Sequence, residues 1–532
     1  MKIRPVHLLL LALLLTALSA AVYAPWLDNP LVFDDRNLLK SVSLLDYAQV
    51  PFSFNTRQFP YFTLGFEYVV SNGNLHVSRS VALVLHALNG FMLYLLAQRL
   101  FARALTPRRA VITALSVAAI FVVHPVAVYG VAYLVQRTIL FATFFLLLSA
   151  LQFDQALSER SWRRALFAGV CFGAAAMAKE HAVTGLVSVM GLVWLHKPAN
   201  GSRRAPMITA FLATALPCAL FVVSQRLGYL GNAYEPNAQA LISAAGFPDA
   251  GSRLGNWMLS AALQCLFFFR YLGLWWWPNP AGMSIDIRPD FSRLAHFPWL
   301  LIGPVALAAL AGAVGFALAA QRARPELKLT AYGLLWALGL FLIEPATVRF
   351  QEAIVLYRSY LWAPGFLLAL AGLVSLIPAR LAAALATVAL LAVLPVTWGR
   401  LDSFSAELKL WQEAASKLSQ PDSAGAIRIH YNLGTFYLHT GKQQQALDEF
   451  DWVIRQDPQS FEGFFMRGWV RASRNELLLA VEDLQTVTRL NPDFGIAHLQ
   501  LGLALSRLGK TEESHAALAR AEALGMPHVD VK

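Results

Sequence analysis

The chain has 532 residues, of which 57% are hydrophobic and 14% are charged. This composition excludes an ordinary soluble globular protein and indicates a membrane protein with many spans. The formal net charge of +11 is uneven, because residues 1–399 carry 29 basic and 15 acidic side chains whereas residues 400–532 carry 14 and 17. The basic excess therefore lies in the apolar part, where cytoplasmic loops need it, and it does not indicate a nucleic-acid partner.

The first apolar segment covers residues 6–23, behind Lys2 and Arg4. As a helix it would be roughly 27 Å long, about one hydrocarbon core. Small residues near its end would also allow a cleaved signal peptide, but the many further apolar segments favour a first span. Phe33-Asp34-Asp35 follows it, so two carboxylates lie in a loop just outside the membrane, which we call the acidic loop. Neighbouring side chains on extended backbone point to opposite sides, so we expect the two aspartates to take different roles.

Further apolar segments continue to residue 398. With the first, the candidates are 6–24, 79–101, 110–128, 138–153, 163–178, 182–196, 207–225, 256–277, 298–320, 329–345, 356–376 and 379–398. The basic loops fall on one side only if one segment between 226 and 297 does not cross. Segment 256–277 contains Arg270 and ends in three tryptophans, so we predict a re-entrant or interfacial helix there and eleven spans elsewhere. The alternative of twelve spans would put the C-terminal region in the cytoplasm.

The C-terminal region contains an internal repeat. Gly434, Gly468 and Gly502 are 34 residues apart, and Pro458 and Pro492 share that spacing. This period, with small residues where two helices touch and Pro at a helix end, is typical of tetratricopeptide repeats. Stacked repeats of this kind form a solenoid with a concave face that suits a peptide.

We therefore predict an all-α protein with a polytopic helical membrane part and a C-terminal α-solenoid. The predicted domains are a transmembrane domain at 1–398, an amphipathic connector helix at 399–426 and three repeats at 427–532. The three cysteines all lie within apolar stretches, so we expect no disulfide framework and no structural metal site.

The remaining polar groups are predicted to gather on the outer side. A carboxylate ionised at neutral pH can accept a proton from an acceptor hydroxyl, and Arg or Lys can bind a departing phosphate. This mixture suits sugar transfer from a polyprenyl phosphate. The candidate catalytic residues are Asp34 and Asp35; the candidates for the donor phosphate are Arg137, Lys179 and Arg358; the candidates for a sugar or acceptor pocket are His124, Gln136, Glu180 and Glu352.

Several strings carry a resemblance to a known family. They are Phe33-Asp34-Asp35, Arg57, His86-Ala87-Leu88-Asn89, His124-Pro125, Tyr133, Gln136-Arg137, Lys179-Glu180, Arg270-Tyr271-Leu272 with Pro280, and Tyr357-Arg358-Ser359-Tyr360-Leu361. With the order of parts, they resemble the GT-C-fold glycosyltransferases, specifically bacterial relatives of transmembrane-and-tetratricopeptide-repeat O-mannosyltransferases. The resemblance implies that Asp34 acts on the acceptor hydroxyl, that Asp35 supports it, and that Arg358 meets the lipid phosphate.

The chain departs from that family around Arg358. Relatives carry Glu-His before this arginine and Pro directly after the Tyr-Leu pair, whereas this chain has Leu356-Tyr357 and Trp362. An acidic partner for Arg358 would then have to be Glu352 or Glu344.

The resulting hypothesis is an inner-membrane glycosyltransferase of a bacterium, with its active-site loops and repeats in the periplasm. It would transfer a sugar from a polyprenyl-phosphate-linked donor to Ser or Thr hydroxyls of exported proteins, for example pilin-like ones, docked by the repeats. Asp34 and Asp35 would allow a divalent cation, but no further acidic cluster requires one. The alternatives are a lipid or surface polysaccharide as acceptor, and a non-enzymatic transporter or scaffold for envelope assembly. The sugar, the polyprenol and the acceptor stay open.

Overall fold

The computed structural model describes residues 5–32, 34–35, 38, 42–51, 53–196, 204–232, 252–294, 298–320, 322–418 and 424–529. Two compact units divide the chain, unit 1 at Met1–Glu407 and unit 2 at Leu408–Lys532. Within the described ranges the secondary structure is helical apart from one isolated antiparallel bridge between Ile287 and Ile354. The predicted all-α class is confirmed, and the chain is a multi-pass membrane protein.

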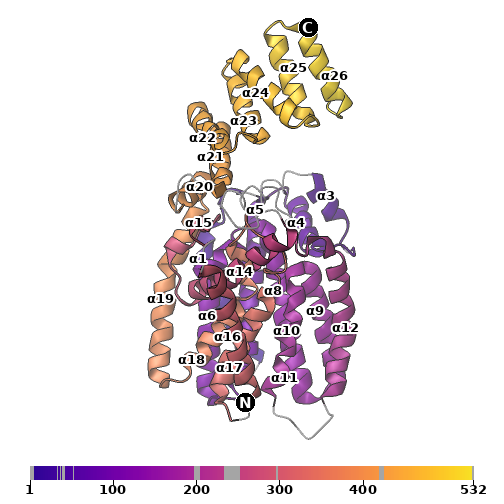
Figure 1. Ribbon diagram of the computed structural model, residues 1–532. Coiled ribbons are helices and arrows are strands. Elements are labelled where there is room, and N and C mark those ends of the chain that lie inside the picture. Colours follow the sequence, from indigo (N-terminus) through magenta and orange to yellow (C-terminus); the bar gives the residue numbers. More distant parts are fainter. Residues whose placement is uncertain are drawn as a thin grey trace. The chain divides into compact units, whose positions relative to one another are not determined.

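Unit 1 is a bundle of apolar helices, most of which run side by side (Figure 1). They are α1 (Pro5–Tyr23), α5 (Leu75–Phe101), α6 (Pro107–Val123), α8 (Arg137–Glu159), α9 (Trp162–Ala178), α12 (Ala205–Ser224), α14 (Arg253–Trp276), α16 (Trp299–Ala319), α17 (Pro325–Phe341), α18 (Ala363–Val374) and α19 (Ala379–Ser403). Shorter elements connect them: η1 (Ala24–Trp26), α3 (Val42–Gln49), α4 (Gln58–Val70), η2 (Pro125–Ala127), α7 (Val128–Val131), η3 (Leu134–Gln136), η4 (Glu180–Thr184), α10 (Gly185–Met190), α11 (Leu192–Leu195), η5 (Leu227–Tyr229), η6 (Pro280–Gly282), α15 (Phe291–Leu294) and η7 (Leu356–Tyr360).

Every apolar segment expected from the sequence is helical, but fewer than eleven helices meet a strict length test. Seven helices in the described part of the chain are long and apolar enough to cross a membrane, or eight if the bent pair α6 and η2–α7 counts as one span. The difference has a simple cause. Helices α9 and α17 have 17 residues each and α18 has 12, and segment 180–195 consists of three short pieces.

Helix α14 corresponds to the segment predicted as re-entrant or interfacial. By length and composition it is one of the seven candidate spans, yet its two ends contact segments at the same end of unit 1. Near its start, Trp257 Nε1 donates to the carbonyl of Pro345 at 2.8 Å, just beyond α17. Near its finish, the Trp275 ring stacks on His124, just beyond α6, with 4.2 Å between centroids. A helix that starts and ends on one side does not reverse the direction of the chain, so the re-entrant or interfacial placement of α14 stays a prediction.

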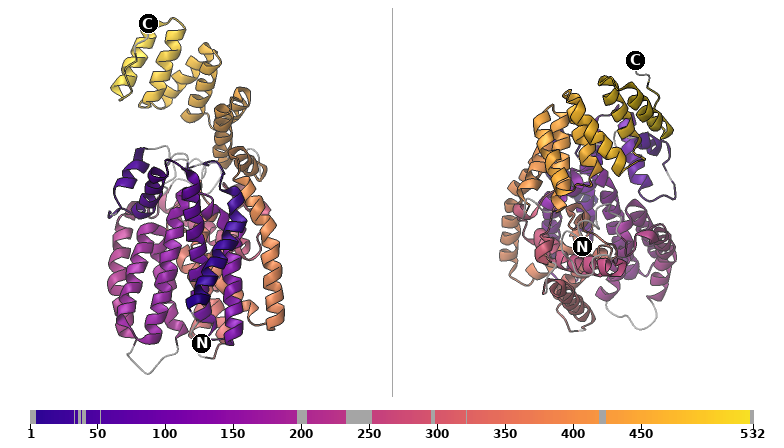
Figure 2. Two further views of the ribbon diagram at one scale, coloured as in Figure 1. Left: turned by 180° about the vertical axis from the view of Figure 1, so that it is seen from behind. Right: turned by 45° about the horizontal axis from the view of Figure 1, so that its top comes forward.

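The same end of unit 1 carries the acidic loop and the last turn of α19. Helix α1 leads into the acidic loop at this end, and the last turn of α19 returns to it, because Asn29 Nδ2 donates to the Leu401 carbonyl at 3.3 Å. We call it the Asp34 end. Figure 2 shows α1 and α19 in the view from behind.

Small residues allow the helices of unit 1 to approach closely. A Cβ added at Gly333 of α17 would lie 2.5 Å from the backbone of Gly365 and Ala369 in α18. Backbone contact through glycine is typical of helix pairs in membranes, where apolar side chains gain little by leaving lipid. Any larger residue at Gly333 would push α17 and α18 apart.

Unit 2 consists of α20 (Glu407–Ser416), η8 (Ala424–Ala426) and three antiparallel helix pairs, with α20 beginning at the last residue of unit 1. The pairs are α21 (Ile427–His439) with α22 (Gln443–Gln456), α23 (Phe461–Ser473) with α24 (Leu477–Leu490), and α25 (Gly495–Arg507) with α26 (Thr511–Ala523). The repeat glycines lie where two helices of a pair meet: a Cβ at Gly434 would be 2.8 Å from Phe450, and one at Gly502 would be 2.6 Å from Leu518. These pairs have the form of tetratricopeptide-like repeats. Residues 399–403, expected in the connector, continue α19 instead.

Candidate active site

The two aspartates of the acidic loop have different surroundings. Phe33 lies outside the described residues, whereas Asp34 is exposed and Asp35 is only 1% exposed. The Asp35 carboxylate accepts hydrogen bonds from the backbone amides of Leu134 at 3.0 Å and Val135 at 2.7 Å. Burial nevertheless raises its pKa to about 7, because desolvation outweighs these hydrogen bonds and nearby Arg79. Asp35 therefore attaches the acidic loop to the start of η3 and leaves Asp34 facing solvent.

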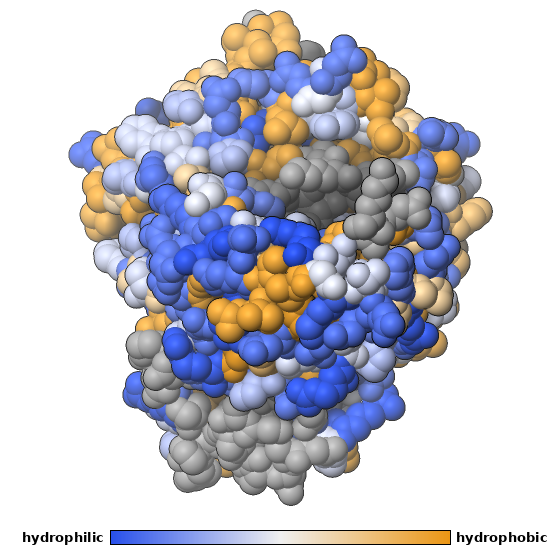
Figure 3. All heavy atoms as spheres, turned by 90° about the horizontal axis from the view of Figure 1, so that it is seen from above, coloured by the Kyte–Doolittle hydropathy of each residue, from blue (hydrophilic) through white to orange (hydrophobic). Residues whose placement is uncertain are grey.

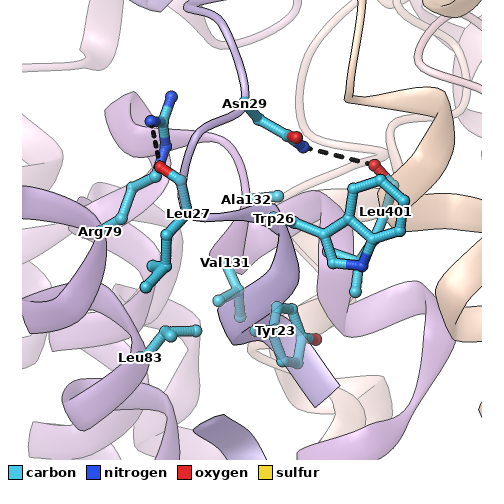
Figure 4. A pocket seen from close by; sticks show the side chains of 9 residues that line it. All are labelled: Tyr23, Trp26, Leu27, Asn29, Arg79, Leu83, Val131, Ala132 and Leu401. Carbon is cyan, nitrogen blue, oxygen red and sulfur yellow. Dashed lines mark hydrogen bonds between the residues drawn. The ribbon is translucent and has the colours of Figure 1, made fainter. Parts of the chain in front are cut away.

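Arg79 and Asn29 fix the chain before the aspartates. Arg79 Nη1 donates to the Leu27 carbonyl at 2.7 Å and Nη2 donates to the Pro30 carbonyl at 3.3 Å. Figure 4 shows Arg79 and Asn29 on either side of a small pocket beside this segment. The pocket is lined by Tyr23, Trp26, Leu27, Asn29, Arg79, Leu83, Val131, Ala132 and Leu401. Contacts to α5 and α19 thus hold the acidic loop to the bundle.

Two tyrosines connect the acidic loop with a group of charged residues. The Asp34 amide donates to the Tyr133 hydroxyl at 3.2 Å, and burial beside the two aspartates raises the Tyr133 pKa well above its usual value. The Tyr133 ring meets the Tyr357 ring edge-on at 6.1 Å between centroids. Lys179 Nζ and Arg358 Cζ lie 5.8 Å and 5.9 Å from the centre of the Tyr357 ring. The acidic loop is therefore linked to the cationic side of the site through these two tyrosines.

The cationic side contains two buried basic side chains, Arg358 and Lys179, which differ in their partners. Arg358 is 4% exposed and binds Glu344 at 3.2 Å and Glu352 at 2.7 Å. The expectation that Glu352 or Glu344 would replace the missing acidic partner of Arg358 is confirmed, because both do. Lys179 is also 4% exposed, and burial, with Arg57 nearby, lowers its pKa to about 7. Lys179 therefore holds its proton less firmly than an exposed lysine does, and an arriving anion would favour its charged form.

Glu180 belongs to the same neighbourhood and is bound by Arg57. Arg57 Nε donates to Glu180 Oε2 at 3.0 Å, and Arg57 Nη2 binds Glu180 Oε1. His181 Nδ1 lies 3.6 Å from Glu180, and His181 Nε2 lies 3.9 Å from Glu344. These contacts join α4, η4 and the segment after α17 into one charged group at the Asp34 end.

Three of the candidate residues are used in packing and are not part of this charged group. Arg137 is 1% exposed and donates to Glu67 at 2.5 Å and to the Ser78 carbonyl at 2.5 Å. His124 stacks on Trp275 and accepts a hydrogen bond from the Val126 amide at 3.3 Å. Gln136 is 3% exposed within η3. Their places suit bracing of the acidic loop better than contact with a substrate.

The arrangement offers a solvent-facing carboxylate, a buried ammonium and a guanidinium at one end of the membrane bundle. A divalent cation held jointly by Asp34 and Asp35 does not fit well, because both Asp35 oxygens already accept backbone amides. The described residues contain no group of three or more His, Cys, Asp or Glu side chains placed to bind a metal. Seen from above, the surface carries mainly polar side chains with scattered apolar ones (Figure 3).

Sequence reasoning gave no role to Tyr133, Tyr357, Arg57 or Arg79. Tyr133, Tyr357 and Arg57 lie in strings that carried the resemblance, which was the available signal for them. The sequence contained no signal for Arg79, because its role depends on the carbonyls of Leu27 and Pro30, about fifty residues earlier in the chain. Such a contact follows only from the folded packing of α5.

No family model matches the chain. DnaJ homolog subfamily C member 3 from Homo sapiens is 32% identical over 88 residues, which are 16% of this chain and 18% of that protein. The Bos taurus and Mus musculus proteins of that name are 32% and 31% identical over the same length. The chain thus spans less than a fifth of these curated relatives. Among solved structures, the Archaeoglobus fulgidus oligosaccharyltransferase tethered to an acceptor peptide is 14% identical with a TM-score of 0.38, over 80% of this chain and 59% of that one.

Proposed function

We propose that this protein is a GT-C-type glycosyltransferase of the bacterial inner membrane with its site facing the periplasm. It transfers a sugar from a polyprenyl-phosphate-linked donor to Ser or Thr hydroxyls of exported proteins. One observation carries the proposal: the acidic loop, with Asp34 exposed, is linked through Tyr133 and Tyr357 to buried Lys179 and Arg358 at one end of the bundle. A base next to buried cations suits attack by a hydroxyl with departure of a phosphate.

The proposed step forms one bond and breaks one. The acceptor oxygen attacks the anomeric carbon of the sugar while Asp34 takes the hydroxyl proton. The bond from the anomeric carbon to the phosphate oxygen breaks, and the polyprenyl phosphate leaves with both electrons. Lys179 and Arg358 stabilise its negative charge, because cations in a water-poor site act more strongly than they do in water.

The remaining residues support this step. Asp35 orients Asp34 through the amides of η3. Glu352 keeps Arg358 in place and, being 23% exposed at its side chain, contributes to the sugar pocket with Glu180. Arg137, assigned to the phosphate from the sequence, is already bound to Glu67 and Ser78, so we assign it with His124 and Gln136 to bracing the site.

The repeats of unit 2 are proposed to dock the acceptor polypeptide. The chain leaves unit 1 at the Asp34 end, because the last turn of α19 is bonded to Asn29 beside the acidic loop.

The test uses the full-length protein in lipid vesicles with a radiolabelled polyprenyl-phosphate sugar and acceptor peptides that contain Ser and Thr. Asp34→Asn should abolish transfer at unchanged membrane insertion, because the amide cannot accept the proton. Asp46→Asn is the matched control, since Asp46 is an exposed aspartate on α3, and it should transfer normally. Full activity of Asp34→Asn would refute the assignment.

The same assay separates the alternatives. Removal of residues 408–532 should end transfer to peptide, whereas survival of transfer to a lipid acceptor would support a lipid or polysaccharide product. Uptake of the sugar without any covalent product would support a transporter.

A further inference from the structure

Arg57 has an uncommon backbone conformation beside the proposed phosphate site. Its φ of 69° lies in the left-handed region, which residues other than Gly, Asn and Asp seldom adopt. Its amide donates to the Met177 carbonyl at 2.7 Å, at the end of α9 and two residues before Lys179. Sparsely populated conformations persist where the surroundings hold them, often at functional sites. In this conformation the side chain of Arg57 reaches Glu180.

The Arg57 guanidinium binds both oxygens of Glu180 through Nε and Nη2. This two-pronged geometry is the strongest that arginine forms with a carboxylate. Glu180 is the chain neighbour of Lys179 and would be its most accessible counter-ion. Arg57 therefore occupies the carboxylate that could otherwise neutralise Lys179.

Lys179 is left with a buried ammonium and no fixed anion. Lys179 is 4% exposed and, in the part of the chain that the structure describes, its ammonium has neither a hydrogen bond nor an ion pair; it contacts the Tyr357 ring. A buried ammonium without a partner is costly, so such a group suits the arrival of an anion. The charged and titratable groups that surround Lys179 are Arg57 before α4, Glu180 and His181 in η4, and Glu352, Tyr357 and Arg358 after α17.

We propose, building on the proposed function, that Arg57 is a positioning residue that holds Glu180 away from Lys179 and so keeps the Lys179 ammonium available for the phosphate of the polyprenyl donor and product. Arg57 acts through Glu180 and does not itself touch the phosphate. Loss of Arg57 releases Glu180, which then pairs with Lys179 and competes with the ligand.

The electrostatics of Lys179 support this arrangement. Burial and Arg57 lower the pKa of Lys179, whereas Glu180 raises it. Without Arg57 the pKa of Lys179 therefore rises, because one repulsive charge is lost and the freed carboxylate approaches. Since phosphate binding needs the protonated lysine, the pH above which binding weakens should move upward in that variant, although binding itself becomes weaker.

The experiment measures binding of a short-chain polyprenyl phosphate to the purified full-length protein in detergent, from pH 5.5 to pH 9. Four variants are compared with the wild type: Arg57→Ala, Glu180→Gln, Arg57→Ala with Glu180→Gln, and the control Arg253→Ala, an exposed arginine at the start of α14. Arg57→Ala should weaken binding about tenfold, as expected for loss of one favourable charge contact. It should also move the alkaline fall in affinity up by about one pH unit.

The double variant decides the mechanism. If freed Glu180 causes the defect, removing its charge restores binding in the double variant to that of Glu180→Gln. Equal weakness of Arg57→Ala and the double variant would show that Arg57 binds the phosphate itself, and wild-type affinity of Arg57→Ala would show that it has no role; either result overturns the inference. Thermal unfolding of each variant identifies misfolded protein, for which Arg57→Lys replaces Arg57→Ala. Failure of the wild type to bind polyprenyl phosphate would instead overturn the donor in the proposed function.

Discussion

At the scale of residues, the neighbouring aspartates in the sequence indicated the acidic loop but not the contacts that fix it to the bundle. The pair Asp34 and Asp35 was expected to divide its roles, and the structure places one in solvent and the other against the amides of η3. The amides that bind Asp35 lie about a hundred residues away in the chain. Local sequence carries no information about such a partner.

The partners of the buried cations could not be predicted from the sequence either. Arg137, Lys179 and Arg358 look alike in the sequence, and all three were expected at the phosphate. The structure separates them by their partners: Arg137 is bound to Glu67, Arg358 to Glu344 and Glu352, and Lys179 to a tyrosine ring. Partner choice depends on which helices pack together, so the sequence could identify the charges but not their assignments.

Asp35 gives a prediction about pH. Its pKa is raised from 3.8 to about 7 in the folded protein, so the folded state binds this proton more tightly than the unfolded state. Folding stability should therefore fall as the pH rises from 4 to 7, by about 4 kcal/mol at the upper limit. Asp35→Asn cannot ionise and should lose that part of the pH dependence.

Thermal unfolding in detergent at pH 5 and pH 8 measures this effect. The wild type should lose more stability between the two pH values than Asp35→Asn does. An equal loss in both proteins would mean that Asp35 is already ionised at pH 5 in the folded chain.

At the scale of elements, hydrophobic pattern located the helices of unit 1 well. Each predicted apolar segment became helical, because length and apolar content are local properties. The pattern did not give the break of segment 180–195 into η4, α10 and α11, nor helices α3 and α4 between the acidic loop and α5. The site depends on these irregular pieces, since α4 begins after Arg57 and η4 begins at Glu180.

Helix α14 offers a prediction about topology. Because both of its ends contact segments at the Asp34 end, cysteines placed at Ser252 and Asn279 should react with a membrane-impermeant maleimide from the same side of the membrane. Thr106→Cys, exposed in the turn between α5 and α6, should react only from the other side.

The native cysteines provide a background correction, because Cys171 is buried and Cys218 and Cys265 are partly buried. Reaction of Ser252→Cys and Asn279→Cys from opposite sides would make α14 a full span. The direction of every later helix would then have to be reversed.

At the scale of the whole molecule, charge asymmetry and repeat spacing predicted the organisation. The basic excess of residues 1–399 and the 34-residue period of the C-terminal glycines together indicated a membrane unit followed by a solenoid. The structure divides the chain at Glu407 and gives three helix pairs in unit 2. Charge counts could not show that α19 ends beside the acidic loop, which depends on the contact of Asn29 with Leu401.

The central claim is that this protein transfers a sugar to exported proteins outside the cytoplasm and that Asp34 is the base in this reaction. Intact-mass measurement of those proteins, from cells with the wild-type gene and from cells with Asp34→Asn, tests it most directly. We expect masses raised by whole glycosyl units at Ser or Thr in wild-type cells and unmodified masses in the variant. Identical masses in the two cell types, with both proteins present in the membrane, would contradict the account.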